Sequence, residues 1–328
     1  MNKMIGIAGG AGFLGSRLSK LFKESKQDYL IMDINDSSVE GSVYVNVEDS
    51  SDFEKFSGLD CIINLAAMHR DDVRPVSRYD DVNVKGAENV CQAARSHSIN
   101  RIIFTSSVAI YGFAPPNTDE NGDANYFNDY GRTKYLAEQV YKEWQSEDPE
   151  NRTLVIVRPT VIFGEGNRGN VYNLLKQIAA RRFVMFGNGE NKKSMAYVEN
   201  VAAFLKHSLT FEPGLHIHNY VDKPDFDMNM LISKTRETLF KKSNVGIRFP
   251  AILGVSIGYV MDFLAGVSGK SFPISSIRVK KFLGTTQFDT SVRKTGFVPP
   301  INLEEGLYRT LHYEFLEDNS DERTFETE

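Results

Sequence analysis

Apolar residues in the first half of the chain recur in short runs that alternate with segments of helical spacing. Met4–Ala8 is an apolar run of strand type, and Phe13–Ser25 then places apolar side chains three or four positions apart. Further strand-like runs lie at Tyr29–Met32, Val43–Val47, Cys61–Ala67, Ile102–Thr105 and Thr153–Val157, and helical spacing returns at Asn83–Ser96 and Tyr130–Trp144. This alternation predicts an α/β fold with a doubly wound parallel (Rossmann) sheet and right-handed crossovers.

The rhythm loosens after Pro159. The segments expected there are a glycine-rich loop at Gly164–Gly169, a helix at Val171–Ala180, a polar turn at Gly187–Lys193, a helix at Ala196–Leu209 and a strand at His216–Val221. We therefore expect a Rossmann domain over residues 1–165, to which 196–222 returns, and a smaller, mostly helical C-terminal substrate lobe over 166–328. The acidic, polar tail from Glu317 onward is expected to be frayed.

Charge and cysteine usage exclude several classes of protein. The 328 residues carry a formal net charge of −5, so no general positive field exists for a nucleic acid, and no nucleic-acid partner is expected. Cys61 and Cys91 each lie in an apolar stretch without a CxxC pair, which predicts neither a disulfide framework nor a metal site. The first residues lack the pattern of a signal peptide, and we expect a cytoplasmic protein.

One apolar segment, Phe249–Val267, is nearly long enough to cross a bilayer. It contains Asp262 and three glycines, and an uncompensated carboxylate is costly in hydrocarbon. We therefore expect no stable membrane insertion and interpret the segment as a buried or partly amphipathic helix of the second lobe. Peripheral membrane contact through 249–267 is the alternative.

Gly9, Gly12 and Gly15 stand directly after the first predicted strand and open the first predicted helix. In this context the triplet is a dinucleotide fingerprint: Gly9 permits a tight turn, Gly12 leaves room for a pyrophosphate, and Gly15 lets the helix pack on the strand. The helix N-terminus then offers N–H donors to the anion. Asp33 ends the second strand, where its carboxylate can bind both ribose hydroxyls and would repel a 2′-phosphate, which favours NAD over NADP.

Tyr130 and Lys134 form a YxxxK pair on one face of a predicted helix. An ammonium beside a phenol favours the phenolate, which lowers the tyrosine pKa from about 10 and lets it remove a hydroxyl proton. Ser107, at the end of the preceding strand, can donate to the same substrate oxygen. Its alternative role is that of a turn or cap residue.

Together these residues resemble the extended short-chain dehydrogenase/reductase family, and within it the NAD-dependent sugar-nucleotide epimerases and dehydratases. The motifs that carry the resemblance are GGAGFLG with Asp33, NLAA at Asn64–Ala67, NVKG at Asn83–Gly86, TSSVAIYG at Thr105–Gly112, YGRTK at Tyr130–Lys134, RPTVIFG at Arg158–Gly164 and AYVENVA at Ala196–Ala202. The resemblance implies an enzyme with Ser107, Tyr130 and Lys134 as catalytic residues.

The resemblance also implies the binding residues and the assembly. Residues expected to bind NAD are Gly9, Gly12, Phe13, Leu14, Gly15, Asp33, Asn46, Val47, Ala66, Ala67 and Pro159, together with Tyr130 and Lys134. Residues expected to bind the substrate are Ser107, Tyr130, Asn170, Lys193 and Arg248. Many relatives carry Arg-Asp where this chain has Lys193 and Ser194, so Lys193 could replace the arginine only as a point charge. A homodimer built on the helices from Asn83 and Tyr130 is expected, with Val90, Ala94, Leu136 and Val140 in either the interface or the core.

Four functions compete for this set of residues, and a fifth, dehydration, is disfavoured. The favoured one is 4-epimerisation of a UDP-hexose or UDP-N-acetylhexosamine through a transient 4-keto sugar. Dehydratases of the family place Asp-Glu after the active-site threonine, where this chain has Val108 and Ala109, so dehydration is disfavoured. A 4-reductase of a UDP-4-keto-6-deoxyhexosamine is the main alternative. A hydroxysteroid-type dehydrogenase and a non-catalytic nucleotide-binding regulator are the others.

Overall fold

A seven-stranded, entirely parallel sheet forms the larger part of the computed structural model, which describes residues 3–35, 41–70, 73–268 and 276–326. The strand order is β10-β6-β5-β4-β1-β2-β3. The strands are β1 (Ile5–Ala8), β2 (Tyr29–Asp33), β3 (Val43–Tyr44), β4 (Cys61–Asn64), β5 (Arg101–Thr105), β6 (Thr153–Pro159) and β10 (Gly214–Tyr220). The predicted doubly wound Rossmann sheet is confirmed.

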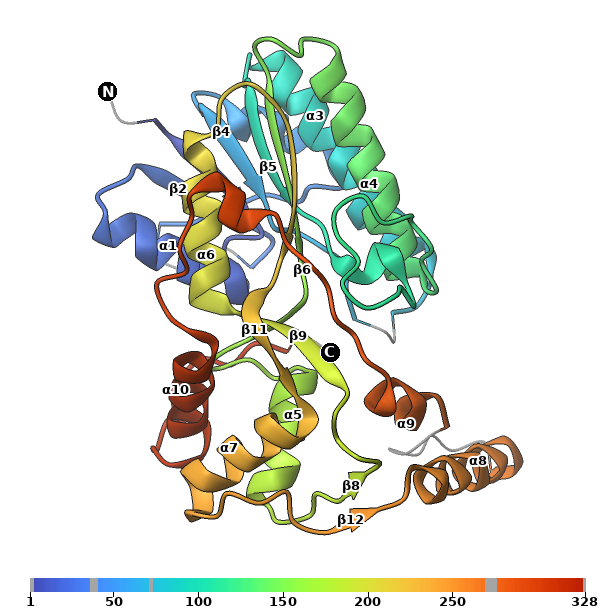
Figure 1. The fold of residues 1–328 in the computed structure, drawn as a ribbon. Coiled ribbons are helices and arrows are strands. Elements are labelled where there is room, and N and C mark those ends of the chain that lie inside the picture. Colours follow the sequence, from blue (N-terminus) through green and yellow to red (C-terminus); the bar gives the residue numbers. More distant parts are fainter. Residues whose placement is uncertain (1–2, 36–40, 71–72, 269–275, 327–328) are drawn as a thin grey trace.

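Helices cover both faces of this sheet (Figure 1). On one face α1 (Phe13–Glu24) packs beside α6 (Val198–His207), and on the other α3 (Gly86–Ser96) packs beside α4 (Asp129–Ser146). Strands covered on both sides must be apolar throughout, and every residue of β1 and β4 is buried. Short helical turns lie at η2 (Ser50–Phe56), α2 (Ser77–Tyr79), η3 (Asp80–Lys85), η4 (Val108–Tyr111), η5 (Ser208–Thr210) and η6 (Val292–Thr295).

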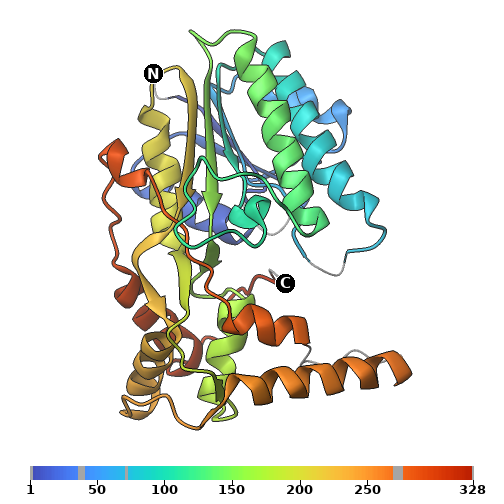
Figure 2. The ribbon, with the colours of Figure 1, turned by 45° about the vertical axis from the view of Figure 1, so that its right-hand side comes forward.

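A smaller part lies beyond the carboxyl ends of the strands. It holds the three-stranded sheet β11-β9-β7 and the strand pair β12-β8. Its elements are β7 (Val161–Phe163), α5 (Asn170–Ala179), β8 (Met185–Phe186), β9 (Lys192–Tyr197), β11 (Asp222–Asp227), α7 (Met228–Phe240), β12 (Arg248–Phe249), α8 (Ala251–Ser268), α9 (Ser276–Leu283) and α10 (Leu303–Phe315). Helices α5, α7 and α10 share a core with β9 and β11, whereas α8 and α9 lie side by side at the edge (Figure 2).

Two local predictions were wrong. Ala196 and Tyr197, expected in a helix, end strand β9, because Tyr197 is fully buried and pairs with Phe163 of β7. The tail is docked rather than frayed as far as Glu326: Phe325 forms a bridge with Asn167, and its ring lies 5.7 Å from that of Phe13. An aromatic residue inside a polar tail supplied an apolar anchor that the tail's composition did not reveal.

The strand order reverses at β1, which pairs with β2 on one side and β4 on the other. Loops leaving neighbouring strands diverge at such a point and open a crevice at the carboxyl ends of the strands. In the described part of the chain, no helix combines the length and the apolar character that a membrane crossing requires.

Candidate active site

A cavity of about 850 Å³ opens at this crevice, between the parallel sheet and the smaller part. Residues expected in the site that line it are Gly9, Gly12, Phe13, Leu14, Gly15, Asp33, Asn46, Val47, Ala66, Ala67, Ser107, Tyr130, Lys134, Pro159 and Asn170. The fold therefore brings the three candidate catalytic residues and the glycine triplet Gly9, Gly12 and Gly15 to one cavity.

Each glycine of the loop meets a different steric demand. Gly9 has φ +75°, and a Cβ there would lie 2.6 Å from the Ala66 nitrogen. At Gly15 a Cβ would lie 2.5 Å from the Gly10 carbonyl oxygen, so glycine lets α1 approach the turn. A Cβ at Gly12, which precedes α1, would meet only the Gly9 carbonyl oxygen, at 3.2 Å, and would otherwise project into free space. This geometry suits a pyrophosphate laid against the N-terminus of α1.

The Asp33 carboxylate is held in place at the end of β2. Its Oδ2 accepts from the Ala11 N–H at 3.0 Å and its Oδ1 from the Asn35 N–H at 2.9 Å. Further along the same wall, the Asn46 Oδ1 accepts from the Glu48 N–H at 3.1 Å. Asp33 thus presents a preoriented acceptor where a dinucleotide's adenosine ribose would lie.

The C-terminal tail closes the cavity beside the glycine loop. Arg323 donates to the Ala11 carbonyl oxygen at 2.9 Å, and its guanidinium lies 4.8 Å from the Phe325 ring centre. The Phe325 N–H donates to Gly166, and the Phe325 carbonyl accepts from the Arg168 N–H, both at 2.9 Å. Arg323, Thr324, Phe325 and Glu326 all line the cavity. A cation therefore lies beside the predicted pyrophosphate site.

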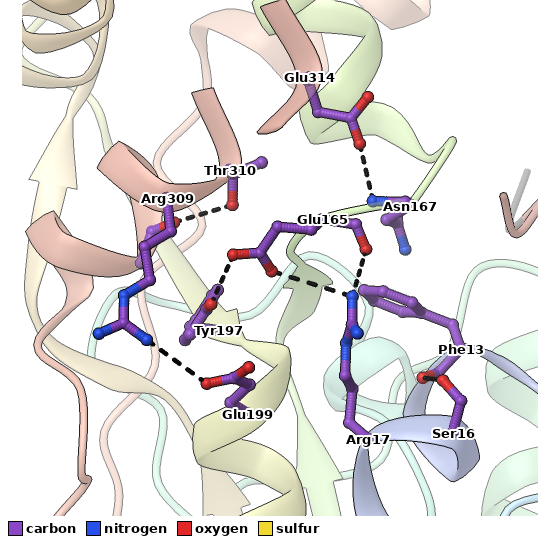
Figure 3. Close-up of polar contacts among 12 residues, drawn as sticks. Phe13, Ser16, Arg17, Glu165, Asn167, Tyr197, Glu199, Arg309, Thr310 and Glu314 are labelled. Atoms are coloured by element: carbon purple, nitrogen blue, oxygen red, sulfur yellow. Dashed lines mark hydrogen bonds and ion pairs between the residues drawn. The ribbon is translucent and has the colours of Figure 1, made fainter. Parts of the chain in front are cut away.

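A polar network next to the tail ties α1 to the smaller part (Figure 3). Arg17 of α1 donates to the Glu165 carbonyl oxygen at 2.7 Å, and the Tyr197 hydroxyl donates to the Glu165 Oε1 at 2.8 Å. Glu314 of α10 accepts from the Gly166 N–H and pairs with Arg168, each at 2.7 Å. These bonds fix the loop after β7 on which Asn167 and the tail rest.

Ser107 caps η4 and also lies beside Tyr130. Its Oγ accepts from the Ala109 N–H at 3.1 Å and so caps η4, and the same hydroxyl is hydrogen-bonded to Tyr130. Helix α4 begins with its own cap, in which Asn128 accepts from the Gly131 N–H at 2.9 Å. Tyr130 therefore lies in the first turn of a capped helix, and its side chain lies beside Ser107 in the cavity lining.

The pKa values of the tyrosine and lysine move in opposite directions. Burial raises the pKa of Tyr130 to about 12, although its hydrogen bond with Ser107 acts to lower it. Burial lowers the pKa of Lys134 to about 7, against the attraction of the Glu138 carboxylate. The expected lowering of the tyrosine pKa by the lysine is not met, because burial outweighs any charge effect. Lys134 instead donates to the Thr105 carbonyl oxygen at 2.7 Å.

A buried ion pair supports this wall from behind. Glu138, one helical turn after Lys134, accepts from Arg158 Nε at 2.8 Å and from Arg158 Nη2 at 2.7 Å. Its Oε1 also accepts from the Ser106 hydroxyl at 2.6 Å. Because Ser106 follows β5 and Arg158 lies in β6, this cluster locks two strand ends to α4, and removing one partner would leave a buried charge unpaired.

Two expected substrate residues lie outside the lining of the cavity. Lys193 donates to the Gly284 carbonyl oxygen at 2.6 Å, and burial lowers its pKa to about 8; its neighbour Ser194 lines the wall instead. Arg248 lies in β12 on a separate shallow surface with Asn229. Its candidacy rested on residue type alone, since nothing in the sequence reported how far β12 lies from the sheet.

Several lining residues were not identified from the sequence. They include Met68, His69, Arg78, Thr105, Asn167, Ser194, Thr286, Phe288 and the tail residues Arg323–Glu326. Met68 and His69 directly follow the NLAA motif, so the loop beside the cofactor could have been extended to them. Desolvation beside the cavity lowers the pKa of His69 below its ordinary value.

Comparison with known proteins agrees with this geometry. The family model described as "NAD dependent epimerase/dehydratase family" matches residues 5–221. An N-acetyl-alpha-D-glucosaminyl-diphospho-ditrans,octacis-undecaprenol 4-epimerase of Escherichia coli O157:H7 is 45% identical over 337 residues, covering 100% of both chains. A UDP-glucose 4-epimerase of Vibrio cholerae is 25% identical over 338 residues, covering 98% of both.

Solved structures share the fold at low sequence identity. A UDP-N-acetylglucosamine 4-epimerase from Bacillus cereus superposes with a TM-score of 0.76 at 15% identity, covering 96% of this chain and 100% of that one. A UDP-glucose 4-epimerase from Thermotoga maritima gives a TM-score of 0.74 at 19% identity, with the same coverage. Both alignments extend through the smaller part as well as the parallel sheet.

Proposed function

The chain belongs to the NAD-dependent epimerase/dehydratase family, and within it we propose a 4-epimerase whose substrate is an N-acetylhexosamine joined through a diphosphate to a polyprenol. The observation that carries this proposal is the 45% identity, over the full length of both chains, with the Escherichia coli enzyme that is named for such a substrate. The cavity supports the proposal as well, because a serine, a tyrosine and a lysine suited to proton transfer line it together with a glycine loop suited to a dinucleotide.

The residues at the crevice fit NAD. Gly12 leaves the N-terminus of α1 open to a pyrophosphate, Asp33 presents acceptors at the end of β2, and Arg323 adds a cation beside the loop. When bound, NAD would accept a hydride from C4 of the sugar and return it. We assign Phe13, Leu14, Asn46, Val47, Ala66, Ala67 and Pro159 to the walls of this site.

The chain's own residues then manage the proton. Tyr130 takes the proton of the C4 hydroxyl as the carbonyl forms, and Ser107 donates a hydrogen bond to the same oxygen. Lys134, held by the Thr105 carbonyl, places its positive charge where it stabilises the Tyr130 phenolate that takes this proton. Tyr130 gives the proton back to the C4 oxygen when the C4–H bond forms again on the opposite face of the sugar, and C4 is then inverted.

The cavity wall formed by η4, beside the tyrosine, favours epimerisation over dehydration. Val108 and Ala109 of η4 occupy the cavity wall where a dehydratase needs acid and base groups for loss of the C6 hydroxyl. Apolar side chains cannot move these protons. Of the lining residues on η4 and its cap, Ser107 is therefore the one that can exchange a proton with the sugar.

A polyprenyl-linked and a UDP-linked sugar share the diphosphate and differ in the group attached to its far side. Asn170 begins α5 at the cavity wall, and we assign it to the diphosphate. Purified enzyme should be incubated with N-acetylglucosaminyl-diphospho-polyprenol and, separately, with UDP-N-acetylglucosamine, without added cofactor. Conversion of the lipid-linked sugar to its galacto isomer supports the proposal. Conversion of the UDP-sugar but not of the lipid-linked sugar would instead indicate a UDP-sugar epimerase. Oxidation of added NADH by the enzyme in the presence of a 4-keto sugar would indicate a reductase.

We also propose a homodimer that pairs α3 and α4 with their copies, and a cytoplasmic location. Val90 and Ala94 are fully buried within the subunit, which leaves Leu136 and Val140 of α4 with surface to offer to a partner. Sedimentation velocity of the wild type and of Leu136→Glu tests this: a monomeric wild type at micromolar concentration would contradict the homodimer.

A further inference from the structure

Helix α8 carries an apolar surface that no other described segment of the chain covers. Nine of the 22 large hydrophobic side chains that are exposed in the described residues fall between Ile247 and Leu264. On α8 these are Ile252, Leu253, Ile257, Tyr259, Val260, Phe263 and Leu264, with Ile252 77% and Phe263 71% exposed. Figures 1 and 2 show α8 reaching away from the body beside α9. Such a concentration marks an interaction surface rather than scattered exposure.

The exposed positions fall on one side of the helix. At 100° per residue they span less than half of the circumference, and Ser256 is the one polar side chain among them. The opposite side contacts the protein: a Cβ at Gly254 would lie 2.8 Å from the Phe186 ring, and Gly258 is buried. Asp262 also lies on this inner side, where its carboxylate accepts from the Ser276 N–H, at 3.2 and 3.3 Å, at the start of α9. The carboxylate that argued against stable membrane insertion therefore faces away from the apolar side.

Basic side chains lie in the segment before α8 and on α9, which packs against it. Lys241, Lys242 and Arg248 are exposed in the segment that leads into α8, and Lys280 of α9 reaches back to the Tyr259 hydroxyl at 2.7 Å. Between residues 236 and 264 the acidic residues are Glu237 and Asp262, so this region is basic in a chain of net charge −5. A basic margin beside an apolar helix is complementary to a layer of anionic headgroups above hydrocarbon.

We propose that α8 lies in the interface of an anionic phospholipid bilayer, with Ile252, Val260 and Phe263 toward the acyl chains and the lysines at the headgroups. An 18-residue helix is about 27 Å long, enough to lie along a membrane surface with its apolar side immersed. Thr286 and Phe288 line the cavity just after α9, which packs on α8, so the docked helix holds this side of the cavity close to the bilayer. That arrangement would serve the lipid-linked substrate of the proposed function, but the docking itself requires no substrate.

Flotation of the full-length protein with vesicles tests the proposal without any sugar. Vesicles of phosphatidylcholine with phosphatidylglycerol should carry the wild type upward, and Ile252→Glu with Phe263→Glu should lower the bound fraction about tenfold or more. Val298→Glu replaces a side chain that is 78% exposed elsewhere and should float like the wild type. Lys241→Glu with Lys242→Glu should weaken binding to these vesicles, and added salt should weaken binding of the wild type.

Two results would overturn the docking. The first is a wild type that does not float with the vesicles. The second is an Ile252→Glu, Phe263→Glu double variant that floats as well as the wild type. A third contradicting result could come from sedimentation without lipid. If the wild type is a dimer and the double variant is a monomer, a second copy of the chain covers α8 instead of a membrane. Epimerisation of a substrate dispersed in detergent should persist in the double variant, since α8 does not line the cavity. Loss of flotation and loss of activity are therefore separate outcomes, and each tests its own proposal.

Discussion

The Asp33 carboxylate accepts a hydrogen bond of 3.0 Å from the backbone N–H of Ala11, which lies within the glycine loop. The residue that would bind the adenosine ribose is thus anchored to the loop that would bind the pyrophosphate. The two halves of the dinucleotide site are set at a fixed separation, and a negative charge stands where NADP would carry its 2′-phosphate.

We expect the protein to bind NADH more tightly than NADPH by several-fold to a few hundred-fold, or about 1–3 kcal/mol, because a phosphate beside Asp33 would be repelled. Fluorescence titration with each nucleotide measures this preference. Asp33→Asn should narrow the difference between the NADH and NADPH affinities. Asp60→Asn, which changes an exposed carboxylate that accepts from the Met4 N–H, should leave that difference unchanged. Equal affinities in the wild type would remove this reason for placing the ribose at Asp33.

Tyr130→Phe should lower turnover by about 100-fold or more, because the group that takes the C4 hydroxyl proton is lost. NADH affinity and thermal stability should stay near those of the wild type, since the ring is kept. Tyr135→Phe, on the same helix but outside the cavity lining, is the matched control and should remain active. Wild-type turnover in Tyr130→Phe would contradict the assignment of Tyr130 as the base.

Activity should rise with pH through an apparent pKa near 7. Tyr130 and Lys134 lie one helical turn apart, and the first proton leaves these two groups near the lower of their pKa values, about 7 at Lys134. Below that pH both groups are protonated and no base is present; above it, the remaining proton can reside on Lys134 and leave Tyr130 as phenolate. A pH profile of kcat/KM tests this. A rise only near the pKa of an ordinary phenol, about 10, would contradict it.

Arg323→Ala should weaken NADH binding by about 5-fold to 50-fold, or about 1–2 kcal/mol, by freeing the tail and removing a cation beside the pyrophosphate site. Stopped-flow measurement of NADH dissociation should show that most of the loss lies in a faster off-rate. Glu322→Gln, the exposed neighbour, serves as the control. An unchanged off-rate in Arg323→Ala would mean that the tail rests on the loop without holding the cofactor.

Local patterns predicted what local physics determines. The apolar runs indicated the strands of the parallel sheet, and the strand–glycine–helix context placed Gly9, Gly12 and Gly15 at the crevice. The i, i+4 spacing put Tyr130 and Lys134 on one helix face, and all of these line the cavity. The fold class and the family are accordingly confirmed.

What the sequence did not reveal depends on distant contacts. Arg323 meets Ala11 across 312 residues, and a polar tail carries no periodicity that would announce such a contact. The same reason explains why Arg248, which was expected to bind the substrate, lies outside the cavity lining: the path of the chain through β12 sets its distance from the parallel sheet. The raised pKa of Tyr130 depends on burial at the cavity wall, which helical spacing alone does not report.

The measurement that tests the central claim most directly follows the hydrogen at C4. The enzyme, purified without added cofactor, is given N-acetylglucosaminyl-diphospho-polyprenol carrying deuterium at C4, and the isomer formed is analysed by mass spectrometry. If hydride leaves C4 and returns within one active site while Tyr130 moves only the hydroxyl proton, the galacto product keeps its deuterium. Loss of the label to water, or its appearance in a nicotinamide released to solution, would contradict epimerisation through an enzyme-held 4-keto sugar.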